Sequence, residues 1–184
     1  MARNISDEEK KEIVSLAGRK AGNLFEACGF CCSESVLVML NQGFGVGLAP
    51  ETAAGMGAGF CEGMGGAGCT CGALSGAIVG LGMVLGPYQK NGVGKKLFRQ
   101  LTQQMHDRFR ERFKATCCRV LTKQVKQDKK AHFANCKMLT IGSAEIVVEM
   151  IIEALADLSE INKAFLASRD SKIGGKVKKF FGKV

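Results

Sequence analysis

The chain has 184 residues, among them nine cysteines and 24 glycines, and its 26 lysines and arginines against 17 acidic side chains give a net charge of +9. A hydrophobic share of 46% suffices for a buried core and argues against disorder, and the length fits one domain. Only 7% of the residues are aromatic, with two prolines and no tryptophan, which argues against a sandwich or barrel. We therefore expect an all-α fold.

Apolar side chains recur at helical spacing along most of the chain, whereas strand patterns are nearly absent. Ser6 and Glu9 have the spacing of a capping box, which predicts the start of the first helix. The expected helices are, in chain order, 7–27, 32–42, a short one that begins at Pro50, 69–85, 93–115 and 143–158. Together they predict a single-domain, compact helical bundle with a glycine-rich central helix.

The stretch 63–89 contains no charged side chain and is long enough to cross a bilayer. Within it, Gly72, Gly76 and Gly80 recur at every fourth position, a spacing that brings helices close together in membranes and in buried cores alike. Two cysteines and a glycine-rich entry fit the wall of a buried site better than they fit lipid. We therefore expect a buried helix here rather than a membrane span.

Charge is distributed in blocks along the chain. Residues 1–86 carry five basic and eight acidic side chains, 87–138 carry 14 and three, 139–162 carry none and five, and 163–184 carry seven and one. We interpret 1–162 as one cysteine-rich helical domain, followed by a basic C-terminal tail, 163–184. The tail is a candidate for contact with an anionic membrane or an acidic partner protein. The basic block has no nucleic-acid-binding motif, so we expect no nucleic acid partner.

The cysteines are the main candidates for chemistry. The N-terminal segment lacks the apolar region of a secretory signal, which predicts a cytoplasmic protein. Because reducing compartments disfavour structural disulfides, metal binding, catalysis or redox chemistry are the common reasons for many cysteines. The nine form four groups near the expected helix ends: Cys28, Cys31 and Cys32; Cys61, Cys69 and Cys71; Cys117 and Cys118; and Cys136.

Spacing alone excludes several cofactors but selects none. A zinc ribbon needs two CxxC pairs, and the chain has one; neither His106 nor His132 completes a Cys2His2 pattern, and both stay unassigned. Haem attachment needs a histidine directly after CxxC, where Cys32 stands. Cys32 and Cys71 lie at expected helix starts, where N–H groups and the helix dipole lower a thiol pKa. In each vicinal pair, we expect one sulfur to face a common site.

The segment CGALSG at 71–76 and residues 29–37, which include Cys32, form a recognisable pattern. They resemble the CGAxxG motif and the early G-x-x-C segment of the C-GCAxxG-C-C family of redox-active proteins, with Cys32 at the cysteine position of the latter. Residues 118–121 (CRVL) resemble its C-R-x-L segment, and Cys136 its last cysteine. The resemblance covers about residues 15–158.

The resemblance implies a mostly helical redox protein in which Cys32, Cys71, Cys118 and Cys136 gather in space. Related domains accompany an iron–sulfur centre, so our leading hypothesis is that these four bind an iron–sulfur cluster, most simply [2Fe–2S], wrapped by the glycine-rich segment 55–72. The cluster would exchange electrons with a redox partner protein; a second copy of the chain is a further candidate partner. The five additional cysteines could serve a second centre, substitute as ligands, or pack: Cys28, Cys31, Cys61, Cys69 and Cys117.

The alternative is a thiol/disulfide redox protein without a metal. The CxxCC run, or the groups at 69/71 and 117/118, would cycle between thiol and disulfide. Positive charge near Arg119 and Lys123 would favour such exchange by a thiolate. The residues themselves do not decide between the two hypotheses, and they do not establish whether the protein is an enzyme.

Overall fold

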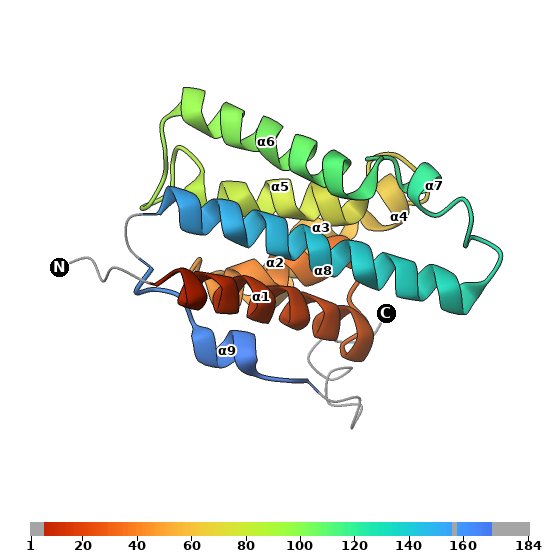
Figure 1. Ribbon diagram of the computed structural model, residues 1–184, viewed down its shortest axis with the longest axis horizontal. Helices are drawn as coiled ribbons and strands as arrows, with labels where there is room; N and C mark the ends of the chain where they lie inside the picture. Colours follow the sequence, from red (N-terminus) through yellow and green to blue (C-terminus); the bar gives the residue numbers. More distant parts are fainter. Residues whose placement is uncertain (1–5, 156–157, 171–184) are drawn as a thin grey trace.

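The computed structural model describes residues 6–155 and 158–170, and within these ranges every regular element is a helix. Two of the segments, α4 and α7, are single turns of four residues. The elements, seen in Figure 1, are α1 (Asp7–Ala27), α2 (Cys32–Gly43), α3 (Pro50–Ala58), α4 (Cys61–Met64), α5 (Gly72–Leu85), α6 (Lys95–Phe113), α7 (Cys118–Leu121), α8 (Lys129–Ala154) and α9 (Lys163–Ala167).

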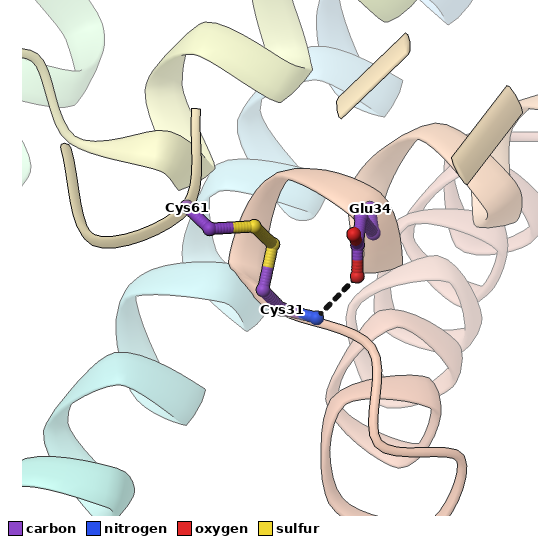
Figure 2. Close-up of side chains that lie close together, drawn as sticks. All are labelled: Cys31, Glu34 and Cys61. Atoms are coloured by element: carbon purple, nitrogen blue, oxygen red, sulfur yellow. Dashed lines mark hydrogen bonds between the residues drawn. A yellow bond between two sulfur atoms is a disulfide. The ribbon is translucent and has the colours of Figure 1, made fainter. Parts of the chain in front are cut away.

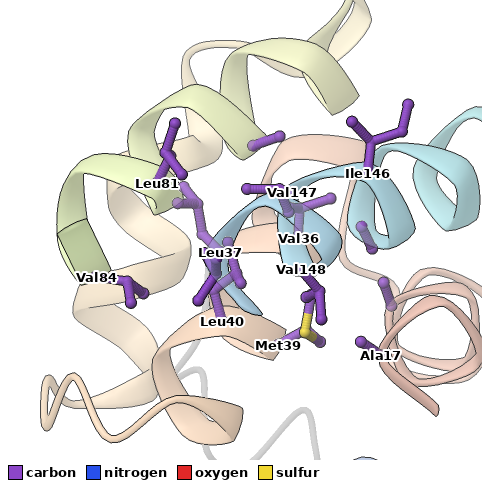
Figure 3. Close-up of a cluster of buried hydrophobic side chains, with 14 of the residues drawn as sticks. Ala17, Val36, Leu37, Met39, Leu40, Leu81, Val84, Ile146, Val147 and Val148 are labelled. Carbon is purple, nitrogen blue, oxygen red and sulfur yellow. The ribbon is translucent and has the colours of Figure 1, made fainter. Parts of the chain in front are cut away.

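The long helices pack side by side, with α8 in contact with α1, α2, α5 and α6 (Figure 1). Figure 3 shows the apolar side chains that these helices contribute to a common core. Leu37 and Leu40 of α2, Leu81 of α5 and Val147 of α8 are completely buried. Each such burial contributes about 1.5–3 kcal/mol. The predicted all-α, compact bundle is therefore confirmed.

Glycine allows α5 to cross α2 with backbones in contact. A Cβ atom at Gly76 would lie 2.7 Å from the carbonyl oxygen of Ser33 and 2.8 Å from its Cα, and one at Gly80 would meet the side chain of Leu40. The glycines of this helix therefore serve close packing, as the sequence predicts. None of the described helices is long and apolar enough to cross a membrane.

The first helix begins where the sequence predicts, because the Ser6 Oγ accepts a hydrogen bond from the Glu9 N–H at 3.2 Å. The prediction for the last long helix is wrong at its start. α8 begins at Lys129 instead of residue 143, since Asp128 caps it by accepting hydrogen bonds from the N–H groups of Lys130 and Ala131. The first half of α8 lacks a continuous apolar stripe, which is the pattern that predicts an amphipathic helix.

Residues 163–170 pack on the bundle rather than extend from it. α9 contacts α1 and α2, and its Leu166 is buried. The amine of Lys20, whose side chain is 1% exposed, lies 2.7 Å from the Asp170 carboxylate and 4.3 Å from the Phe165 ring centroid. This ion pair satisfies a charge that would be costly to bury alone. The rest of the proposed tail, 171–184, lies outside the described residues.

Candidate redox and metal site

The four cysteines that the resemblance singles out all line one cavity of about 440 Å³: Cys32, Cys71, Cys118 and Cys136. The cavity lies at the end of the bundle that carries α4 and α7, on the right in Figure 1. Here α1 ends, α2 and α5 begin, and α8 passes with its first half. Of the five additional cysteines, only Cys31 also lines this cavity.

Helix starts position three of the four cysteines. Cys32 is the first residue of α2, Cys118 is the first residue of α7, and Cys71 is the N-cap of α5. The fourth, Cys136, lies within α8. The start of α5 is held against the chain before α7, because the Cys71 N–H donates to the carbonyl oxygen of Thr116 at 2.8 Å. The predicted helix-start positions of Cys32 and Cys71 are confirmed.

A glycine-rich loop after α3 closes one side of the cavity, to which it contributes Gly66 and Gly68. A Cβ atom at Gly63 would lie 2.7 Å from the Cβ of Cys118, and φ at Gly63 is +73°, a left-handed value that glycine adopts without strain. Only glycine lets the loop approach α7 this closely. We expected the whole segment 55–72 to wrap the site, but its first part belongs to α3, which ends at Ala58.

Burial dominates the acid–base properties of the cavity cysteines. It raises the pKa of Cys32 to about 11 and that of Cys71 and Cys136 to about 12, and it also raises the pKa of Cys118. Backbone N–H groups at the starts of α2 and α5 oppose this effect, as expected for helix N-termini. The predicted lowering of the pKa is nevertheless wrong, because the lost hydration outweighs these hydrogen bonds. The metal-free thiols are therefore protonated at neutral pH.

The positively charged side chains of Arg119 and Lys129 face the same cavity, and so does the imidazole of His132, for which the sequence predicts no role. On α8, Lys129, His132 and Cys136 follow one another at intervals of three and four residues, so they share one helix face. This spacing is the signal that identifies His132 once the helix start is known. Cationic side chains would offset the negative charge of several thiolates in the cavity.

The sulfur atoms of the four cysteines are not arranged around a single ion. Zinc binds thiolate at about 2.3 Å in a tetrahedron, which places ligand sulfurs about 3.8 Å apart. Among the described residues, the one cysteine-containing group of three whose ligand atoms all lie within 4.8 Å is Cys31, Glu34 and Cys61. A cluster with two or more irons distributes its cysteines over different irons, so it requires no three sulfurs at such close range.

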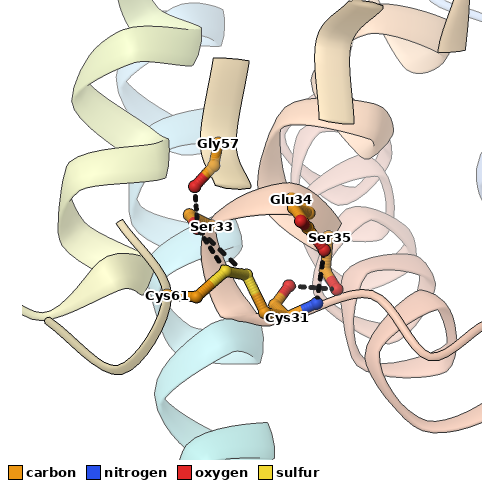
Figure 4. The surroundings of a disulfide bond; sticks show 6 residues. All are labelled: Cys31, Ser33, Glu34, Ser35, Gly57 and Cys61. Carbon is orange, nitrogen blue, oxygen red and sulfur yellow. Dashed lines mark hydrogen bonds between the residues drawn. A yellow bond between two sulfur atoms is a disulfide. The ribbon is translucent and has the colours of Figure 1, made fainter. Parts of the chain in front are cut away.

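Cys31 and Cys61 form a disulfide beside the cavity, with their Cα atoms 5.9 Å apart (Figure 2). Figure 4 shows the polar groups around it: the Ser33 hydroxyl lies 3.2 Å from the Cys31 sulfur and donates to the Gly57 carbonyl oxygen at 2.7 Å. A Glu34 carboxylate oxygen accepts from the Cys31 N–H at 2.8 Å. In the disulfide neither sulfur is a thiolate, so these two could serve as metal ligands only after reduction.

A second cysteine pair lies at the rim of the site. The sulfurs of Cys69 and Cys117 are 3.3 Å apart, within hydrogen-bond distance but not joined as a disulfide, and Cys69 is exposed. In the vicinal pair at 117/118 one sulfur faces the cavity, as expected, whereas both Cys31 and Cys32 line it. The remaining cysteine, Cys28, caps the end of α1 outside the cavity, and burial raises its pKa. The spacing of the cysteines along the chain does not indicate which of them pair.

Comparison with known proteins identifies the family of the chain. A family model described as "putative redox-active protein (C_GCAxxG_C_C)" matches residues 30–150, a range that contains Cys32, Cys71, Cys118 and Cys136. No curated protein and no solved structure matches the chain. The cysteine cluster at the end of the bundle could bind a metal. Because the family model matches more than half of the chain, the chain belongs to this family of cysteine-rich, redox-active proteins.

Proposed function

We propose that the four cavity cysteines bind an iron–sulfur cluster, most simply [2Fe–2S], and that the protein exchanges single electrons with a redox partner. One observation carries the proposal: Cys32, Cys71, Cys118 and Cys136 come from α2, α5, α7 and α8 and line the same cavity. Four cysteine thiolates are a complete ligand set for such a cluster. When bound, the cluster would supply one-electron redox chemistry that thiols alone do not offer.

The chain provides groups that would tune a bound cluster. Against the larger effect of burial, backbone N–H groups of Ser33 and Glu62 lower the pKa of Cys32, and that of Ala73 lowers the pKa of Cys71. Hydrogen bonds to ligand sulfurs and burial are among the factors that set the reduction potential of a cluster. Ligand binding also requires that each thiol lose its proton, so the raised pKa values make cluster assembly release protons.

The partner remains a proposal that rests on charge. α7, the start of α8 and the segment between them present exposed cations around the cavity, among them Arg119, Lys126 and Lys129. An acidic surface on a redox partner protein would complement them, and electrostatic attraction would speed the encounter. A second copy of this chain is the other candidate partner. We also propose that the protein lies in the cytoplasm and that the basic tail makes peripheral contact with a membrane.

The decisive test is anaerobic purification of the full chain, followed by analysis of iron and acid-labile sulfide. We expect a coloured protein with iron and sulfide in equal amounts, and loss of both after substitution of a cavity cysteine. Cys28→Ser is a matched control, since this cysteine lies outside the cavity. A colourless protein that stays free of iron after chemical reconstitution would refute the cluster.

The disulfide between Cys31 and Cys61 favours a second candidate function, thiol/disulfide redox chemistry without a metal. In this mechanism the pair gains two electrons and two protons on reduction and loses them on oxidation. Thiol counting discriminates between the two functions. The second one requires a reversible change of two thiols in iron-free protein, mapped by mass spectrometry to this pair. If strong reductants opened the Cys31–Cys61 disulfide and it did not form again on oxidation, the second function would be contradicted.

A further inference from the structure

The pair of cysteines at the rim of the site is a second, separate thiol centre. Cys69 lies in the loop between α4 and α5, and Cys117 is the N-cap of α7. Their sulfurs are 3.3 Å apart although 48 residues separate them in the sequence. Neither lines the cavity, Cys69 is exposed and Cys117 is half-buried. A reagent in solution can therefore reach this pair without entering the cluster site.

Hydrogen bonds between the two loops hold the pair together. The Arg119 N–H donates to the Gly68 carbonyl oxygen at 2.9 Å, and its guanidinium donates to that of Ala67 at 2.7 Å. On the other side of Cys69, the Cys71 N–H donates to the Thr116 carbonyl oxygen at 2.8 Å. These bonds flank both cysteines, so little backbone movement is needed to join the two sulfurs. Such preorganisation reduces the entropy lost when the bond closes.

We propose that Cys69 and Cys117 form a thiol–disulfide exchange site that reduces an anionic, low-molecular-weight disulfide. The Cys69 thiolate attacks one sulfur of the substrate disulfide, forms a mixed disulfide and releases the first thiolate. The Cys117 thiolate then attacks the Cys69 sulfur, forms the Cys69–Cys117 disulfide and releases the second. Two electrons pass from the pair to the substrate, and the two protons of the pair end on the two released thiols.

The exposure of the two cysteines determines which one attacks first, and the charges around them determine the substrate class. Cys69 attacks first because it is the more exposed of the two, and Cys117 resolves because it lies in contact but is less accessible. The guanidinium of Arg119 lies against the same loop, and Lys123 and Lys126 follow on exposed positions. These cations favour a disulfide that carries carboxylates over a neutral one. The site goes beyond the cluster proposed above and does not depend on it.

The test uses fully reduced, iron-free full-length protein and oxidised glutathione as the probe. After acid quenching and alkylation, cleavage at Glu62, Lys90, Lys114 and Arg119 gives peptides 63–90 and 115–119, and fragmentation assigns the sulfurs. We expect a bond between Cys69 and Cys117 and two glutathione thiols released for each bond formed. A bond that instead joins Cys71 to Cys118, or no bond between these peptides, would overturn the inference.

Variants separate the two steps of the exchange. Cys117→Ser should stop at the mixed disulfide and accumulate one glutathione on Cys69, whereas Cys69→Ser should react at least about tenfold more slowly at this site. Cys28→Ser is the matched control and should form the bond at the rate of the unaltered protein. If the glutathione adduct on Cys69 accumulated equally in the unaltered protein and in Cys117→Ser, the resolving step by Cys117 would be contradicted. This measurement requires no iron.

The substrate class is tested by charge in the same assay. We expect oxidised glutathione to react several-fold faster than hydroxyethyl disulfide, a neutral compound, at low salt, and salt to reduce this difference. Equal rates at low salt would refute the preference for an anionic disulfide. If the protein binds no iron but forms the Cys69–Cys117 bond, the cluster proposal is refuted and the exchange site is supported. If it binds iron but forms no such bond, the exchange site is refuted and the cluster proposal is supported.

Discussion

The interior of the cavity and its rim use neighbouring residues of the same two chain segments, yet they expose their cysteines very differently. Cys71 is 3% exposed and Cys69, two residues earlier, is exposed; Cys118 lines the cavity and Cys117 does not. The interior thiols are desolvated and suited to bind a cofactor, whereas the rim thiols touch each other and meet solvent. In our two proposals, a short glycine-rich loop and a one-turn helix would therefore serve two kinds of thiol chemistry.

The largest expected effect separates interior from rim by iron content. Replacement of a ligand in a four-cysteine site leaves one iron incompletely coordinated. We expect Cys71→Ser to lower the iron bound after reconstitution by at least about tenfold, and Cys69→Ser to leave it unchanged. Iron and sulfide analysis of both variants, prepared in parallel, provides the measurement. Equal losses in the two variants would show that the distinction between interior and rim does not govern metal binding.

Thiol reactivity offers the next largest contrast. Because burial raises the pKa of Cys136 to about 12, this cysteine holds on the order of a thousandfold less thiolate near neutral pH than an ordinary thiol does. Its alkylation rate should therefore keep rising about tenfold for each pH unit from 7 to 9, whereas the rate of an ordinary thiol levels off near its pKa. Time-resolved alkylation of iron-free, reduced protein, read by mass spectrometry for each cysteine, measures both.

The labelling order provides the control for that experiment. Exposed Cys69 should react first, and Cys71 and Cys136 should react last. Unfolding of the chain would make all nine cysteines react alike, so circular dichroism is recorded at each pH. A plateau in the rate for Cys136 below pH 9 in folded protein would show that burial does not control its ionisation.

The contact between α2 and α5 connects Cys32 to Cys71, and a single methyl group tests it. A Cβ atom at Gly76 would overlap the backbone of Ser33, so we expect Gly76→Ala to destabilise the fold by about 1–3 kcal/mol. Gly55→Ala is the control, since nothing lies within 4 Å of the added atom, and it should be neutral or slightly stabilising. Urea denaturation measures both. An unchanged midpoint for Gly76→Ala would mean that the helices can separate at little cost.

Local sequence signals predicted those parts of the fold that local interactions determine. The first helix matches its prediction, 7–27, because a serine cap and an apolar stripe both lie within that segment. α8 was predicted only in its apolar second half. Its first half turns Lys129, His132 and Cys136 toward the cavity beside Phe133 and Leu139, so polar side chains interrupt the apolar stripe on its inward face. A functional site on a helix face removes the very pattern by which such helices are recognised.

The candidate site divides in the same way. The resemblance to the family identified four of the five cysteines that line the cavity, although they come from four separate segments of the chain. The pairs formed by Cys31 with Cys61, and by Cys69 with Cys117, were not predictable, because they depend on how the loop between α3 and α5 turns. That loop adopts left-handed backbone at several glycines and at Glu62, where φ is +55°. Sequence spacing carries no information about such a path.

The smallest expected effect concerns the rim alone. The Arg119 guanidinium donates to the Ala67 carbonyl oxygen and so holds the loop of Cys69 against the segment of Cys117. A hydrogen bond of this kind contributes about 0.5–1.5 kcal/mol, so Arg119→Ala should lower the equilibrium constant for the Cys69–Cys117 bond in a glutathione buffer by about two- to tenfold. Arg119→Lys should recover little of it, because a lysine cannot reproduce the planar guanidinium contact. If the equilibrium constant stayed the same in both variants, the loop would be held by its backbone hydrogen bonds alone, and preorganisation at the rim would belong to Gly68 and Thr116 rather than to Arg119.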